Sequence, residues 1–503
     1  MKLFTAEQIR ALDRYTIEHE PIASIDLMER AAQAFTDWFV QHYPASRPVA
    51  IFCGMGNNGG DGLAIARLLQ AQRYTVQCFV MKLKAQGSDD FETNLQRLQE
   101  LTTVTLLERA EQLPVALPDD ALLIDALFGS GLDRPVEGFP AQLIQFLNRT
   151  KLPTVAVDIA SGLFADRPNG SGDVIVKPEA TFSFQFPKLA FLLPGNAQYV
   201  GEWYVGDIGL HPEVIQQTET SWFYTDAAAA RALLQPRTRF SHKGNFGRAL
   251  LIAGSYGKIG AAVLSAHACL RAGAGLTSAL IPQCGYKIMQ TALPEVMVMT
   301  AGSNKKIVSD FPPLGAYDAI GVGPGLGKDF KTAKALGGLI EKMISPMVID
   351  ADAINLTAEN QAWLAKLPRQ SIFTPHPKEF ERLVGPVAND YERLARAKEF
   401  AQRYQCVIVL KGAYTAVVLW NGEVHFNTTG NPGMAKGGSG DALTGILTAL
   451  LAQEYDSATA AKLGVYLHGA AGDLAAQHNG MIAMTATDLI EQLGHAFEQL
   501  NHA

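Results

Sequence analysis

Sequence signals of several common protein classes are missing from this chain. Its five cysteines are an odd number in 503 residues and none belongs to a CxxC pair, so neither a disulfide framework nor a zinc site is expected. No apolar run approaches the length of a membrane span. A formal net charge of -7, with both signs interspersed, offers no footprint for a nucleic acid. The opening MKLFTAEQIRALDRYTIEHE predicts a capped amphipathic helix rather than a signal peptide. We therefore expect a cytoplasmic protein without nucleic-acid or membrane partners.

Two nucleotide-binding signatures are absent as well. No GxxxxGK[ST] loop occurs, because the nearest stretch, GPGLGKDF at 323–330, has the wrong spacing and an acid after Lys328. No kinase HRD or DFG set is found either. Any nucleotide chemistry here must use a different loop.

What the chain does have is an alternation of β-rich runs, glycine turns and helical stretches. This alternation predicts mainly parallel sheets with helices on both faces. It lapses around 211–245 and then restarts, which predicts two tandem α/β domains, residues 1–220 and 221–503, without internal repeats. The expected strands lie at 49–53, 76–81, 121–125, 154–158 and 180–184, and then at 250–254, 317–323, 346–350, 371–375 and 406–412.

The first glycine motif, GMGNNG at 54–59, follows a predicted strand. It satisfies GxGxxG, but the acid that a dinucleotide fold expects at the end of the second strand is absent, since that strand ends in FVMKLK. The motif carries Asn57, Asn58 and Asp61 among glycines, so a ligand loop and a ligand-free turn capped by Asn and Asp are equally favoured by the motif alone.

Two further strand ends favour a site. Asp125 and Asp158 each end a predicted strand, and Ser161 follows shortly after the second. In an open parallel sheet these ends meet at one crevice with the Asn57–Asp61 motif. The cluster holds oxygen donors but no His or Cys, so a metal there would be an oxygen-preferring cation. One carboxylate remains to act as acid or base.

The second glycine motif, GNPGMAKGGSGD at 430–441, directly precedes a helical stretch. Glycines before a helix N-terminus let backbone N–H groups converge on an anion. A carboxylate would repel a bound phosphate, so we interpret Asp441 as the base that activates a hydroxyl attacking that phosphate, with Mg²⁺ neutralising the nucleotide. The alternative is a helix cap, which the glycine-rich context disfavours.

Further polar residues follow predicted strands of the second domain. Lys411 could steady a phosphate. Singly, His376 between prolines is more often a structural hydrogen-bonder, and VIDADAIN is compatible with a simple helix start. The group comprises Asp350, Asp352, Asn355, His376 and the Lys411–Thr415 segment.

These motifs resemble those of a known family. GNNGGDG, DALFGSGL and VDIASG resemble the NAD(P)H-hydrate epimerase domain. GNFGRALLIAGS, GVGPGLG, VIDADAIN, TPHPKEF, VLKGAYT and GNPGMAKGGSGDALTGI resemble the ADP- or ATP-dependent NAD(P)H-hydrate dehydratase, a relative of ribokinase-like kinases. Their order is that of the bifunctional bacterial repair enzymes. The resemblance implies a Rossmann-like three-layer α/β/α domain followed by a ribokinase-like α/β domain.

The resemblance also implies roles for individual residues. In the first domain it implies Asp158 as the catalytic residue, and potassium ligands at Asn58, Asp125 and Ser161. Its implied substrate contacts are Asn57, Asn58, Gly59, Gly60, Asp61, Gly129, Ser130, Gly131, Leu132, Asp133, Arg134, Pro135 and Asp158. In the second domain it implies hydrate contacts at Ala261, Gly325, His376 and Asp441, with Asp441 catalytic, and nucleotide contacts at Lys411, Gly412, Ala413, Tyr414, Thr415 and Gly440.

Substrates and assembly follow from the same resemblance. It implies NADHX and NADPHX as substrates, favours ADP over ATP as the co-substrate, and suggests a homo-oligomer. One departure is Ala160, where the family usually has proline, and the lost restraint on φ could loosen the Asp158–Ser161 turn. Two other functions stay open at this point: a ribokinase-like kinase for a vitamin-precursor alcohol, and a non-catalytic dinucleotide sensor.

Overall fold

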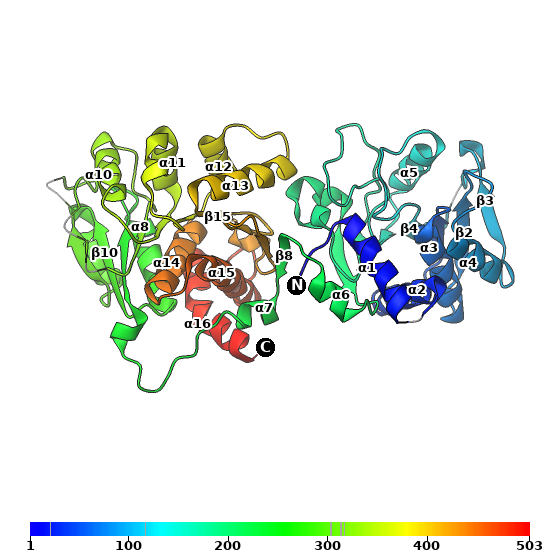
Figure 1. Cartoon of the computed structure of the whole chain (residues 1–503), viewed down its shortest axis with the longest axis horizontal. Coiled ribbons are helices and arrows are strands. Elements are labelled where there is room, and N and C mark those ends of the chain that lie inside the picture. Colours follow the sequence, from blue (N-terminus) through cyan, green and yellow to red (C-terminus); the bar gives the residue numbers. More distant parts are fainter. Residues whose placement is uncertain (21, 116, 302–303, 312–313, 316, 503) are drawn as a thin grey trace. The chain divides into compact units, whose positions relative to one another are not determined.

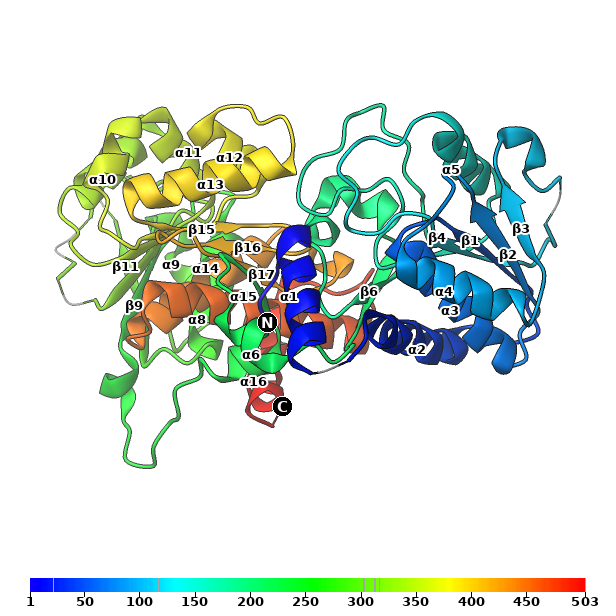
Figure 2. The same cartoon turned by 45° about the vertical axis from the view of Figure 1, so that its right-hand side comes forward.

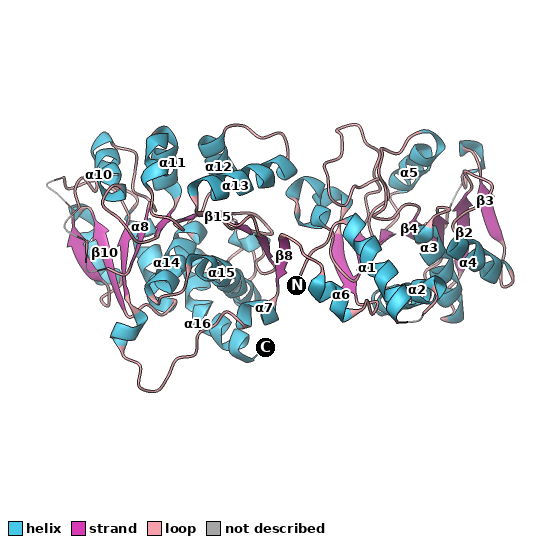
Figure 3. Ribbon diagram, in the orientation of Figure 1, coloured by secondary structure: helices cyan, strands magenta, loops and turns pink. Residues whose placement is uncertain are grey.

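The computed structural model describes residues 1–20, 22–115, 117–301, 304–311, 314–315 and 317–502. The chain divides into two compact units. The N-terminal unit comprises Lys2–Thr220 with Asn389–Tyr391, and the C-terminal unit comprises Met1, Ser221–Ala388 and Glu392–Ala503. Each unit is a sheet with helices packed against it (Figures 1 and 3). None of the helices in the described ranges combines the length and apolar character that a membrane crossing requires.

The N-terminal unit is built on a parallel sheet. Among its described residues the strand order is β3-β2-β1-β4-β5-β6-β7, and every neighbouring pair is parallel. This is a Rossmann-like order, whose direction reverses between β1 and β4, where such sheets bind ligands. The strands are β1 (Val49–Cys53), β2 (Val76–Met81), β3 (Val104–Leu107), β4 (Leu122–Ala126), β5 (Thr154–Val157), β6 (Ala180–Phe184) and β7 (Glu202–Gly206).

Alternate residues of the N-terminal strands face two helical layers. Ile51 of β1 belongs to a core with helices α2, α3 and α4, whereas its neighbour Phe52 belongs to a core with α5. Helix α1 packs on α2 through Leu12 and Leu27. The result is a three-layer α/β/α unit. Its helices are α1 (Ala6–His19), α2 (Ser24–His42), α3 (Asn57–Ala71), α4 (Asp89–Gln99), α5 (Gly138–Thr150) and α6 (Pro212–Gln217).

The C-terminal unit contains a larger sheet. Its described strands follow the order β11-β10-β9-β12-β13-β14-β15-β16-β17-β8, antiparallel only at the β15–β16 and β16–β17 pairs. The strands are β8 (Trp222–Thr225), β9 (Arg248–Ile252), β10 (Leu276–Ile281), β11 (Met297–Thr300), β12 (Ala319–Val322), β13 (Met347–Ile349), β14 (Ile372–Phe373), β15 (Val407–Leu410), β16 (Ala416–Val418) and β17 (Val424–Asn427).

Helices cover both faces of this sheet as well (Figure 2). Ile372 of β14 belongs to a core with α8, α14, α15 and α16, whereas Phe373 contacts Phe400 of α13 on the other face. The helices are α7 (Ala227–Arg231), α8 (Ile259–Arg271), α9 (Tyr286–Ala292), α10 (Phe330–Ile340), α11 (Ala351–Glu359), α12 (Pro377–Val384), α13 (Asp390–Tyr404), α14 (Ser439–Ala452), α15 (Ser457–Asn479) and α16 (Ala486–His502).

All the strands expected from the sequence are present, but one local interpretation was wrong. The Asn57–Asp61 motif is not a loop, since α3 begins at Asn57. The chain turns at Gly54–Gly56 instead, and Gly59 packs so closely that a Cβ there would lie 1.8 Å from the Gly54 carbonyl oxygen. Only glycine permits this approach between strand end and helix. The asparagines are therefore held rigidly in the first turn of a helix.

Candidate active sites

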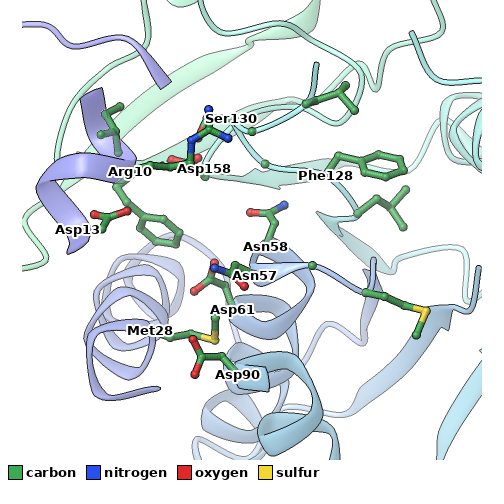
Figure 4. Close-up of a pocket in the computed structure, with 18 of the residues that line it drawn as sticks. Arg10, Asp13, Met28, Asn57, Asn58, Asp61, Asp90, Phe128, Ser130 and Asp158 are labelled. Atoms are coloured by element: carbon green, nitrogen blue, oxygen red, sulfur yellow. Dashed lines mark hydrogen bonds between the residues drawn. The ribbon is translucent and has the colours of Figure 1, made fainter. Parts of the chain in front are cut away.

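The carboxyl edge of the N-terminal sheet opens into a cavity of about 1330 Å³. That volume exceeds the range of roughly 300–1,000 Å³ common for small-molecule sites. Residues from three predicted segments line it together: Asn57, Asn58 and Asp61, all seven residues 129–135, and Asp158 (Figure 4). Gly59, Gly60, Asp125 and Ser161 do not line it, and all four are buried.

Asp158 is the most constrained residue at this cavity. It follows β5 with φ +65°, a left-handed conformation that costs a non-glycine residue about 1 kcal/mol or more and that is concentrated at functional sites. Its Oδ1 lies 2.7 Å from Nζ of Lys188, which is only 1% exposed. Burial raises the pKa of Asp158, but the Lys188 ammonium and its hydrogen bond outweigh burial and hold the pKa below its usual range. Asp158 is therefore an ionised base at neutral pH.

Lys188 was not identified from the sequence. It precedes the short helix η2 (Leu189–Leu192) and also donates to Ser183 Oγ at 2.9 Å. A lysine inside the apolar stretch FQFPKLAF was the available signal, because lysine is almost never fully buried without a partner.

Asp125 and Ser161 form a buried hydrogen-bonded pair that joins the ends of β4 and β5. Ser161 donates from its backbone N–H to Asp125 Oδ2 at 2.8 Å and from Oγ to Oδ1 at 2.6 Å. Burial raises the pKa of Asp125 to about 6, although these hydrogen bonds oppose the rise. The Asn58 side chain lies against Gly129, and its buried Nδ2 has no partner among the described residues.

The side chains of Asp125, Ser161 and Asn58 are suited to an oxygen-preferring cation. Asp125 and Ser161 bring a carboxylate and a hydroxyl oxygen together in a buried place, and the buried Asn58 side chain offers an amide oxygen. Hard cations select such donors. The backbone nearby is fixed: the Leu163 N–H donates to the Ala160 carbonyl at 3.0 Å and closes the turn that lacks the family's proline.

The C-terminal unit has a second cavity, of about 490 Å³, at the N-terminus of α14. Ala261, Gly325 and Asp441, three of the four hydrate contacts that the resemblance implies, line it together. Lys258, Asp352, Asn355 and Glu379 also line it, of which Lys258 and Glu379 were not identified from the sequence. Lys258 Nζ lies 3.4 Å from Asp352 Oδ2.

Asp441 stands in the first turn of α14 but does not cap it. The cap position is Gly438, whose φ of +98° suits glycine, and the Asp441 carboxylate has no hydrogen-bond partner within the described residues. Burial raises its pKa to about 6, helped by nearby Asp350 and opposed by Lys411. The helix-cap alternative is thus not supported by the geometry. An unpaired carboxyl beside free helix N–H groups is available for proton transfer.

A network centred on Asp350 lies beneath the glycine motif. Asp350 is 1% exposed and accepts from Thr374 at 2.6 Å, Lys411 at 3.1 Å and Thr444 at 2.9 Å. A Cβ on Gly440 would be 3.4 Å from Lys411 Nζ, so the ammonium adjoins the glycine backbone. Asp350 therefore orients Lys411 instead of capping α11, where it makes no side-chain cap bond.

The remaining predicted residues lie outside the lining of this cavity. His376 caps α12, because its Nδ1 accepts from the backbone N–H groups of Lys378 and Glu379 at 3.2 and 3.4 Å. This is the structural alternative considered for it. Lys411–Thr415 form the turn between β15 and β16, closed by the Thr415 hydroxyl on the Gly412 carbonyl at 3.0 Å.

Fold and sites together define a two-centre α/β enzyme: one unit presents an ionised carboxylate beyond a Rossmann-like sheet, and the other presents a carboxyl at a glycine-flanked helix N-terminus. Residues 249–495 match the NAD(P)H-hydrate dehydratase family, and residues 24–190 match the YjeF-related protein N-terminus.

Relatives extend this match over the whole chain. The bifunctional NAD(P)H-hydrate repair enzyme Nnr of Moorella thermoacetica is 37% identical, covering 99% of this chain and 97% of its own. That of Vibrio cholerae is 37% identical over 97% of each. The ADP/ATP-dependent NAD(P)H-hydrate dehydratase of Bacillus subtilis, co-crystallised with ATP/Mg²⁺, is 33% identical with a TM-score of 0.50, covering 55% of this chain and 98% of that one. The chain belongs to the bifunctional NAD(P)H-hydrate repair enzymes, which join an epimerase and a dehydratase.

Proposed function

We propose that the N-terminal unit interconverts the R and S epimers of hydrated NADH and NADPH, and that the C-terminal unit dehydrates the S epimer at the expense of ADP, with ATP as the alternative. The observation that carries the dehydratase half is the unpaired Asp441 carboxyl in the first turn of α14. The substrates follow from family membership. A cytoplasmic location and a homo-oligomeric state belong to the same proposal.

The dehydratase step begins with the substrate hydroxyl, a poor leaving group at neutral pH. Ionised Asp441 takes its proton, and the oxygen attacks the terminal phosphate held against the Gly437–Gly440 backbone. Lys411, oriented by Asp350, steadies the phosphate charge. Loss of phosphate from the ring carbon, with a proton from the adjacent carbon, then restores NAD(P)H.

Mg²⁺ would enter with the nucleotide. The described residues contain no cluster of three or more His, Cys, Asp or Glu side chains arranged for a metal. Mg²⁺ is commonly held by one or two carboxylates together with substrate phosphates. Asp352 and Glu379 line the cavity and would supply those carboxylates. It would neutralise phosphate charge.

The epimerase step uses the lability of the carbon beside the ring nitrogen. The nitrogen lone pair assists loss of the hydroxyl, and water returns on the other face of the iminium ion. Asp158, kept ionised by Lys188, takes the proton of the incoming water. Asn58, Asp125 and Ser161 would hold K⁺, which would supply a fixed positive charge that orders the adjacent backbone.

Two isosteric variants test the assignment. Asp441→Asn should lower nucleotide-dependent recovery of NADH absorbance by about 100-fold or more while leaving epimer interconversion, followed by chromatography, near wild type. Asp158→Asn should do the converse. Recovery that persists in Asp441→Asn would refute the base assignment. Accumulation of a stable phosphorylated alcohol, instead of free phosphate and NAD(P)H, would establish a kinase.

A further inference from the structure

Three acidic side chains gather at the N-terminal cavity. Asp13 of α1, Asp61 of α3 and Asp158 after β5 all line it, and Lys188 is the ammonium buried among them (Figure 4). In Figure 4 Asp13 lies to the left of Asp158 and Asp61, with Asp158 higher and Asp61 lower in the view. Asp158 repels both Asp13 and Asp61 electrostatically, and Asp13 repels Asp61. Arg10 and Arg14 also line the cavity, but within the described residues only Lys188 forms an ion pair with one of these three acids. Burial therefore favours a proton on the two acids that lack such a partner.

Hydrogen bonding shows which acid is the ionised one. Asp158 holds Lys188 at 2.7 Å and accepts from the Phe184 N–H at 3.4 Å. Neither Asp13 nor Asp61 has a hydrogen-bond or ion-pair partner among the described residues. Asp158 therefore carries the charge, and the proton resides on the other two acids.

Asp13 and Asp61 differ in access to solvent. Asp61 is 9% exposed and sits in the second turn of α3, and burial holds its pKa well above the usual range. Asp13 is partly exposed at the cavity wall, and burial, followed by repulsion from Asp158, raises its pKa to about 6 against the attraction of Lys188. Arg10 and Arg14 of the same helix line the cavity beside it. Asp13 can thus hold a proton and also exchange it near neutral pH.

We propose that Asp13 is the second acid–base residue of the epimerase site, giving a proton to the hydroxyl that leaves one face of the ring while Asp158 receives one from the water that adds to the other. This inference rests on the proposed epimerase function. Helix α1 and the end of β5 bring the two carboxyls to the cavity from different elements, as a reaction with two faces requires.

The step is balanced as follows. The C–O bond breaks with its electron pair going to oxygen, the Asp13 proton completes a water molecule, and the nitrogen lone pair forms the iminium bond. A water oxygen then bonds to the same carbon from the other face, its proton passes to Asp158, and the iminium pair returns to nitrogen. Solvent resets the two carboxyls, and in the opposite direction they exchange roles.

Asp13→Asn in the full chain tests this proposal. Wild-type kcat for epimerisation, corrected for the uncatalysed rate, should fall as pH rises through about 6 because Asp13 loses its proton. The variant should lose about 100-fold or more in kcat with KM within about threefold, and its residual rate should no longer fall over that interval. Dehydration of the S epimer by the same preparation should be unchanged.

Glu18→Gln is the matched control, since it removes an exposed carboxylate from the same helix and should retain wild-type kcat. Retention of kcat by Asp13→Asn, or a residual rate that still falls through pH 6, overturns the proposal. Wild-type protein that does not epimerise at all refutes instead the proposed function of the N-terminal unit. The two failures are therefore distinguishable.

Discussion

The buried pair of Asp158 and Lys188 shows what a single residue contributes. Lys188 is 1% exposed, and Asp158 is both buried and held at positive φ. Such a pair is weak support for stability, but removing one partner leaves an uncompensated charge. The effect of Lys188 is therefore to keep the Asp158 carboxylate ionised at a position where burial alone would favour its protonated form.

Lys188→Met should test this at residue scale. We expect a loss of about 3–5 kcal/mol in the free energy of unfolding at pH 8, because Asp158 becomes a buried, unpaired charge. The wild-type pKa of Asp158 is lowered, so its stabilising contribution is present above the unfolded pKa of 3.8 and lost as pH falls through the lower folded value. In the variant Asp158 protonates more readily, so the deficit should shrink at pH 5. Denaturant unfolding of both proteins at the two pH values measures it, and an equal deficit at both contradicts it.

At the scale of elements, the start of α14 is fixed by α15. His468 Nε2 lies 2.9 Å from the Ser439 carbonyl oxygen, which only accepts, so this nitrogen carries the hydrogen. Burial lowers the pKa of His468 to about 4, which keeps the ring neutral at pH 7. This hydrogen bond from α15 therefore fixes the backbone at Ser439, two residues before Asp441.

His468→Phe should weaken this support. Loss of a buried hydrogen bond of about 1 kcal/mol predicts a rise of roughly fivefold in KM for the nucleotide, with dehydratase kcat also reduced. His468→Gln, which can still donate to Ser439, should recover most of the loss. Steady-state kinetics with varied ADP give both parameters, and identical behaviour of the two variants would mean that ring volume, not the hydrogen bond, matters.

At the same scale, some features of the fold and sites were predictable from the sequence and others were not. Both glycine motifs, the strand-end acids and the expected strands follow from period, glycine placement and parallel-sheet geometry. Lys188 and Asp13 do not, because Lys188 matters through its ion pair with Asp158 and Asp13 through its place at the same cavity, and no local pattern encodes either. Strand β8 lay in the stretch at 211–245 where the alternation lapses, and its place beside β17 is a non-local pairing.

For the whole molecule, the two units each carry their own core and cavity. We expect residues 1–220 expressed alone to interconvert the epimers, and residues 221–503 alone to dehydrate the S epimer with ADP. Circular dichroism would verify folding of each fragment, and chromatography and NADH absorbance would measure the activities. A fragment that folds but lacks its activity would contradict this autonomy.

Finally, the Asp350 carboxylate accepts hydrogen bonds from three segments that are far apart in sequence. They are the end of β14, the end of β15 and the second turn of α14. A substitution aimed at any of them will be transmitted to the other two. The Gly412–Tyr414 turn, a nucleotide contact that the family resemblance implies, follows that junction in the chain. Substitutions meant to change nucleotide preference should therefore begin there and leave Asp350 and its three partners in place.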